Sequence, residues 1–133
     1  MVVARGSTGS GVVATVSQAA IEAFLPQGGK PGALTASATN PTSSSANVFG
    51  GQVLALELSV DFSNRGITAT GLAGLHLTSG PLAGDTVAQV LAAANQALGG
   101  GALPAGMTIS DLNDVVNNIN QSWDNGSPTG YVK

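Results

Sequence analysis

Hydrophobic residues recur at helical spacing between residues 86 and 98. The apolar positions fall at i, i+3, i+4, i+7 and i+11, which is the stripe of an amphipathic helix. They are Val87, Val90, Leu91, Ala94 and Leu98. Thr86 followed three residues later by Gln89 predicts a capping box that satisfies the first backbone donors of this helix. The pattern therefore predicts a helix over 86–98.

Two other segments carry helix signals. Residues 109–123 place apolar side chains on one face, with Thr108 or Ser110 as the N-cap. Asp111 in the first turn suits the positive end of the helix dipole. Residues 18–25 form a shorter amphipathic stretch that ends at a proline. These two segments bring the predicted helices to three.

Alternating or β-branched residues predict short strands. Within residues 52–62, Leu, Val or Phe alternate with Ala, Glu, Ser or Asp, which is the period-2 pattern of a half-buried strand. Ala, Leu and Glu are also good helix formers, and we favour the strand on its alternation. A β-branched run predicts a strand over 11–16, and an apolar segment predicts another over 72–78. We therefore expect an α+β fold in which these strands pack against the helices.

The length of 133 residues fits one domain, because a chain of this size can bury a sufficient core. Gly and Ser dominate the first residues, so we expect 1–10 to be a flexible N-terminal segment. The globular domain should then span 11–126, and 127–133 should form a polar C-terminal tail.

Charge is sparse along the whole chain. Only 8% of the residues are charged and the net charge is -3, which argues against nucleic acid because phosphate binding needs a basic patch. A surface with so few charges repels its neighbours weakly and favours packing against other copies. No apolar run is long enough to span a membrane, and the first residues lack the pattern of a signal peptide.

The sequence contains few residues that could act in catalysis or bind a metal. The chain has no cysteine, and His76 is its single histidine, which we interpret as structural or simply exposed. Asp111 and Asp114 lie three apart and could act as an acid–base pair. The helix dipole and a solvated face explain them more simply. We therefore expect no enzyme activity, no cofactor and no metal.

Several short stretches resemble a module that recurs in large secreted or surface-attached, adhesin-like bacterial proteins. The resemblance covers roughly residues 12–126 and is carried by AIEAFLP at 20–26, PGALT at 31–35, GQVLAL at 51–56 with DF at 61–62, SGPLAG at 79–84 and LND at 112–114. It implies an extracellular or cell-surface structural role and supplies no catalytic residues. The N-terminal part is shorter here than in that module, which leaves the strand at 11–16 as an exchangeable edge.

These observations predict a non-catalytic extracellular module that self-assembles within a surface filament, layer or adhesin. Strand addition at the edge would supply the contact, through Val12, Val13, Ala14, Thr15 and Val16. The alternative is a module that binds polysaccharide or another surface ligand. Its ligand face would be the amide-rich side of the last helix, at Asn117, Asn120 and Gln121.

Overall fold

The computed structural model describes residues 2–5, 13–15, 18–36, 38–39, 43–124 and 127–133. Helices make up most of the regular structure in these residues: α1 (Gln18–Phe24), α2 (Val48–Asn64), α3 (Val87–Leu98), α4 (Ile109–Asn120) and the short 3-10 helix η1 (Leu72–Gly74). The strands are β1 (Val2–Arg5), β2 (Val13–Thr15), β3 (Ala38–Thr39), β4 (Trp123–Asp124) and β5 (Ser127–Pro128). The chain is therefore mostly helical, and the expected α+β fold with several core strands is wrong.

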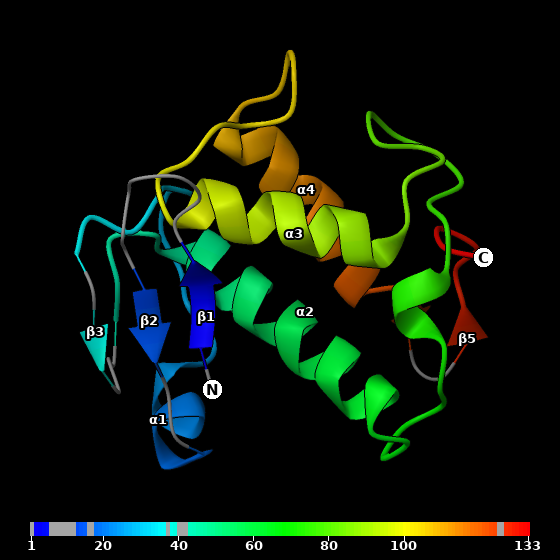
Figure 1. The fold of residues 1–133 in the computed structure, drawn as a ribbon, viewed down its shortest axis with the longest axis horizontal. Helices are drawn as coiled ribbons and strands as arrows, with labels where there is room; N and C mark the ends of the chain where they lie inside the picture. The colour runs from blue at the N-terminus through cyan, green and yellow to red at the C-terminus, as the bar shows by residue number, and fades with distance from the viewer. Residues whose placement is uncertain (1, 6–12, 16–17, 37, 40–42, 125–126) are drawn as a thin grey trace.

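Helix α2 runs through the middle of the molecule and packs against both α3 and α4 (Figure 1). It contains all of the expected strand 52–62, so that prediction is wrong. The buried residues Phe49, Val53, Leu56 and Val60 follow helical spacing, and Leu54 is buried beside them. A helix that is apolar on most sides belongs in a core, and its sequence then contains alternations that imitate a strand.

Helices α3 and α4 confirm the amphipathic patterns. Gln89 Oε1 accepts a hydrogen bond from Thr86 N at 2.8 Å, and Thr86 Oγ1 accepts one from Gln89 N at 3.2 Å, which completes the predicted capping box. Thr108, one of the two expected caps, begins α4 in the same way. Helix α4 ends at Asn120, three residues before the predicted end, because the next residues turn into β4.

The expected strand at 11–16 is present over its described residues, whereas the one expected at 72–78 is replaced by other structure. In the first segment, the described residues Val13–Thr15 form β2, which lies between antiparallel β1 and parallel β3. This stretch is therefore the middle of a small sheet and not a free edge. In the second, Leu72–Gly74 is η1, while His76 and Leu77 make only isolated bridges.

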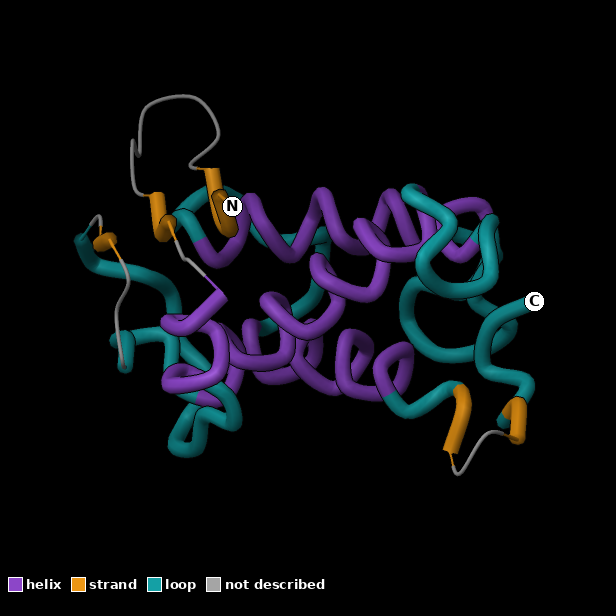
Figure 2. Tube along the Cα trace, turned by 90° about the horizontal axis from the view of Figure 1, so that it is seen from below, coloured by secondary structure: helices purple, strands orange, loops and turns teal. Residues whose placement is uncertain are grey.

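Both ends of the chain take part in the fold. The segment expected to be a flexible N-terminus contains β1, and residues 6–10 lie outside the described residues. The expected polar tail packs onto the domain: His76 N donates to Lys133 O at 2.7 Å, and Lys133 N donates to His76 O at 2.9 Å. Val132 is only 7% exposed and joins the core. Figure 2 shows the N-terminal sheet and the C-terminus at opposite ends of the helices.

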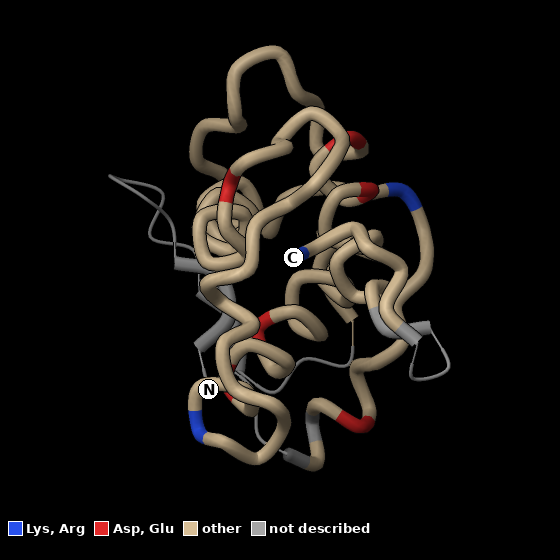
Figure 3. The backbone as a smooth tube through the Cα atoms, turned by 90° about the vertical axis from the view of Figure 1, so that its right-hand side faces the viewer, with Lys and Arg blue, Asp and Glu red and all other residues tan. Residues whose placement is uncertain are grey.

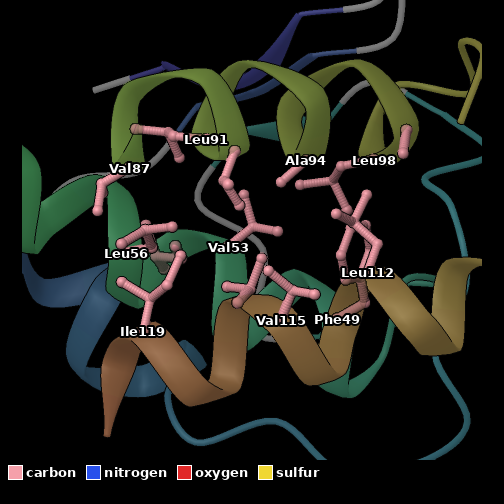
Figure 4. Packing of buried hydrophobic residues seen from close by; sticks show 14 of the residues in the cluster. Phe49, Val53, Leu56, Val87, Leu91, Ala94, Leu98, Leu112, Val115 and Ile119 are labelled. Atoms are coloured by element: carbon pink, nitrogen blue, oxygen red, sulfur yellow. The ribbon is translucent and has the colours of Figure 1, made fainter. Parts of the chain in front are cut away.

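Side chains from α2, α3 and α4 interlock in one core (Figure 4). The largest buried residues include Phe49, Leu56, Leu98, Leu112 and Ile119. This core fixes how α4 lies on α2, and α4 carries part of the candidate site. Within the described part of the chain, no helix has the length and apolar character needed to cross a membrane.

Two isoleucines test this description of the core. Ile119 is 2% exposed and Ile67 is 68% exposed. We expect Ile119→Ala to lower the free energy of unfolding by about 2–5 kcal/mol, because it removes buried methyl groups and leaves a cavity. Ile67→Ala should change it by less than about 0.5 kcal/mol. Urea unfolding of both variants measures the difference, and equal losses would contradict the assigned core.

Candidate functional site: a polar groove at the C-terminal end

Three segments that are far apart in the sequence meet at the end of the molecule where the C-terminus lies (Figure 1). They are the last turn of α4, the turn that follows Leu77, and the C-terminal segment after β5. Between them lies a groove of about 710 Å³. Its lining combines two carboxamides, three aliphatic hydroxyls and one phenol, from Asn118, Gln121, Thr78, Ser79, Thr129 and Tyr131.

Backbone and hydroxyl hydrogen bonds hold the C-terminal segment in place. Thr78 Oγ1 donates to Gly130 O at 2.7 Å, and Thr78 N donates to Tyr131 O at 2.9 Å. Thr129 N donates to Ser122 O at 2.8 Å and so joins the same segment to the end of α4. Because these bonds connect all three walls, the folded chain holds the groove open before any ligand arrives.

Tyr131 is the one aromatic residue of the lining, and it is half-buried. Burial raises the pKa of its phenol above the usual 10.0, and a hydrogen bond with the Asn118 side chain offsets part of that rise. Gly80, with a φ of 86°, faces the hydroxyl: a Cβ at this position would lie 3.3 Å from Tyr131 Oη. Glycine thus leaves room for a neutral phenol at the wall of the groove.

None of the described residues that line the groove carries a formal charge. Figure 3, seen from the side of the C-terminus, shows that the charged residues are spread thinly along the chain. The ion pair between Arg65 Nε and Asp61 Oδ1, at 3.1 Å, is exposed and lies outside the groove lining. The lining therefore offers hydrogen bonds and an aromatic ring without an electrostatic preference for ions.

The structure separates the three residues of the expected ligand face. Gln121 lines the groove, whereas Asn117 is not part of its lining. Asn120 turns toward α2, where its Nδ2 donates to Gln52 O at 2.9 Å and to Gln52 Oε1 at 2.8 Å. Asn120 thus joins two helices, and of the three residues only Gln121 lines the groove.

The ligand face predicted from the sequence leaves out Asn118, although this residue belongs to the same amide-rich stretch, and it leaves out Tyr131. Asn118 lies in the last turn of α4 and Gln121 is the C-cap three residues later, so helical spacing places both on the same side. Tyr131 was assigned to a polar tail, although it and Val132 are the two large apolar side chains of residues 127–133. That pair was the available signal that the tail returns to the domain.

The other candidate residues do not assemble into a site. Of the predicted self-association segment, Val12 and Val16 lie outside the described residues, and Val13–Thr15 form the middle strand of the sheet. Asp111 Oδ2 accepts hydrogen bonds from Thr108 N at 2.8 Å and from Thr108 Oγ1 at 2.9 Å. These bonds complete the capping box at the start of α4, and they also lower the pKa of the Asp111 carboxyl.

No group of three or more His, Asp or Glu side chains that could hold a metal ion occurs in the part of the chain that the structure describes. His76 is exposed, and its backbone pairs with Lys133. Comparison with protein-family models, with curated proteins and with solved structures finds no match to this chain. The chemistry of the groove itself is therefore the basis for inferring a function.

The single tyrosine allows a direct test of the groove wall. Burial favours the neutral phenol, so its stabilising effect is complete below the unfolded pKa near 10.0 and is lost as pH rises through the higher folded value. We expect the phenolate absorbance of the folded chain to appear at higher pH than that of the urea-unfolded chain. The free energy of unfolding should fall over the same range in the wild type and less in Tyr131→Phe. Coincident titration of the folded and unfolded chains would contradict this.

Proposed function

We propose that this chain is a non-catalytic extracellular module that binds a neutral polysaccharide in the groove at its C-terminal end. The observation that carries the proposal is the lining of the groove, which consists of two carboxamides, three aliphatic hydroxyls and one tyrosine. None of the described residues that line the groove is charged. Sugar hydroxyls both donate and accept hydrogen bonds, and carboxamides and hydroxyls do the same. The tyrosine adds an apolar face with a polar tip, which suits a ring that has both kinds of surface.

An extracellular location is supported by the sequence. The resemblance to modules of secreted and surface-attached bacterial proteins favours it, and so does a chain that is only 8% charged. A neutral groove on a sparsely charged surface also fits a ligand that carries few charges of its own.

Binding is supported better than self-assembly through residues 12–16. The assembly hypothesis needed an unpaired strand edge at this segment. β2 pairs with β1 on one side and, through Ala14 and Thr15, with β3 on the other, so it lies inside the described sheet and is not the unpaired edge that the assembly hypothesis requires. The groove, in contrast, is a preformed concave surface with several convergent polar groups.

Alanine variants on α4 separate the groove from the rest of the amide-rich helix. Gln121 is exposed and Asn118 borders the groove, so we expect Gln121→Ala and Asn118→Ala each to weaken glycan binding by about threefold to tenfold. Asn117→Ala is the matched control, because it removes the same amide from the same helix outside the lining. A glycan array finds the ligand, and calorimetry with that glycan measures the affinities.

Two results would contradict the proposal. One is a wild-type chain that binds no neutral glycan on the array. The other is equal weakening by Asn117→Ala and Gln121→Ala, which would place the ligand on another face of α4. Light scattering at the concentrations used shows whether the chain is a monomer, so that avidity of an assembled form is not mistaken for affinity of the groove.

A further inference from the structure

Residues 129–133 supply one wall of the polar groove, and we call them the C-terminal strap. Thr129, Gly130 and Tyr131 of the strap belong to the groove lining. The other lining residues come from the turn after Leu77 and from the end of α4. The groove is therefore complete only while the strap is docked on the rest of the domain.

The strap docks as a short strand along the segment that follows η1. His76 N donates to Lys133 O at 2.7 Å, and Lys133 N donates back to His76 O at 2.9 Å. Thr78 N donates to Tyr131 O at 2.9 Å. Tyr131 and Lys133 are two positions apart in an extended segment, so these three bonds lie along the same side of the strap. A strand held along one side can separate from its neighbour without breaking other pairings.

The segment beneath the strap has a second set of bonds on its other side. Leu77 N donates to Asp85 O at 2.9 Å, and Gly84 N donates to Leu77 O at 2.8 Å. Val87 N, in the first turn of α3, donates to Leu75 O at 2.9 Å. None of these bonds involves the strap. The segment therefore stays attached to the start of α3 when the strap leaves.

Few buried side chains anchor the strap. Of its five residues, all of which the structure describes, only Val132 is buried, at 7% exposed. Tyr131 is half-buried, and Thr129 and Lys133 are exposed. Helix α3, in contrast, buries six residues. Segments with few buried apolar contacts open locally at a lower free energy than the whole domain unfolds.

Thr78 makes the side-chain bonds that hold the strap. Its Oγ1 donates to Gly130 O at 2.7 Å and also lies 3.2 Å from Tyr131 O. A threonine hydroxyl has a single proton, so these carbonyls use the whole donor capacity of the side chain. Although Thr78 lines the groove, its hydroxyl proton is directed to the strap and not to a ligand.

We infer that the C-terminal strap docks and releases as one unit, independently of the helical core, and that Thr78 is the positioning residue that keeps it docked. The docked state forms the groove, and the released state removes the wall that carries Tyr131. Release is a property of the fold and needs no glycan. Only its effect on affinity rests on the proposed function, because the apparent affinity falls in proportion to the fraction of chains with a docked strap.

Amide hydrogen exchange of the wild-type chain without glycan tests the release. The amides of His76, Thr78 and Lys133 donate the bonds between the strap and its neighbour. We expect these three to share one protection factor, within about threefold, and to be at least about tenfold less protected than amides in the middle of α2 and α3. Protection equal to that of the helices would overturn the inference, because the strap would then open only by global unfolding. Absence of protection would overturn it too, because the strap would not be docked.

Variants of the turn test the role of Thr78. Thr78→Val removes the hydroxyl and keeps the branched shape, so protection of the Lys133 amide should fall by about threefold to tenfold in the chain without glycan. Thr78→Ser keeps the hydroxyl and should preserve the wild-type protection. Ser79→Ala is the matched control, because it removes a hydroxyl from the next residue of the groove lining. Amides of α2 and α3 should be unchanged in all three variants, and wild-type protection of Lys133 in Thr78→Val would overturn the assigned role.

Glycan binding is measured separately, so the two proposals can fail independently. A wild-type chain that binds no neutral glycan, but whose strap amides exchange as a unit, would overturn the proposed function and support the strap. A chain that binds glycan, but whose strap amides are as protected as the helices, would overturn the strap and leave the proposed function standing.

Discussion

The burial of α2 is the constraint on which the rest of the structure depends. This helix is apolar on most of its surface, so it is stable only when other elements cover it on several sides. Helices α3 and α4 cover two of them, and the chain that follows α1 approaches a third. At that third side, a Cβ on Gly51 would lie only 3.0 Å from Gln27 Cβ and 3.2 Å from Gln27 N. Glycine therefore permits a backbone approach that a larger residue would block.

The packing of α4 against α2 determines where the last turn of α4 lies at the candidate site. The inner residues of α4, such as Leu112 and Ile119, are fixed in the core against α2. Its last turn then presents different amides to different surroundings: Asn120 to Gln52 on α2, and Gln121 to the polar groove. A rigid element thus forms one wall of the groove, which is the kind of support that a precise binding site needs.

Sequence patterns predicted the elements whose burial is one-sided. Helices α3 and α4 each have one apolar face and a local capping box, and both features can be read from neighbouring residues. Helix α2 is buried on several sides, so the spacing of its apolar residues does not single out one helix face. The alternation from Leu54 to Phe62 then resembles the pattern of a strand. The strand at 11–16 was assigned correctly over Val13–Thr15, but its two partners lie elsewhere in the chain and could not be read locally.

The groove was hard to predict because non-local hydrogen bonds build it. Gln121 was named from the amide-rich helix, yet its neighbours in the groove come from the turn at Thr78 and from the segment at Tyr131. The bond from Thr78 Oγ1 to Gly130 joins residues 52 positions apart, and no spacing rule in the sequence reports such a pairing. Sparse charge did carry information, because a lining without charges follows from a chain that has few of them. What the sequence could not supply is which amides and hydroxyls converge, and the specificity of a neutral site depends on that convergence.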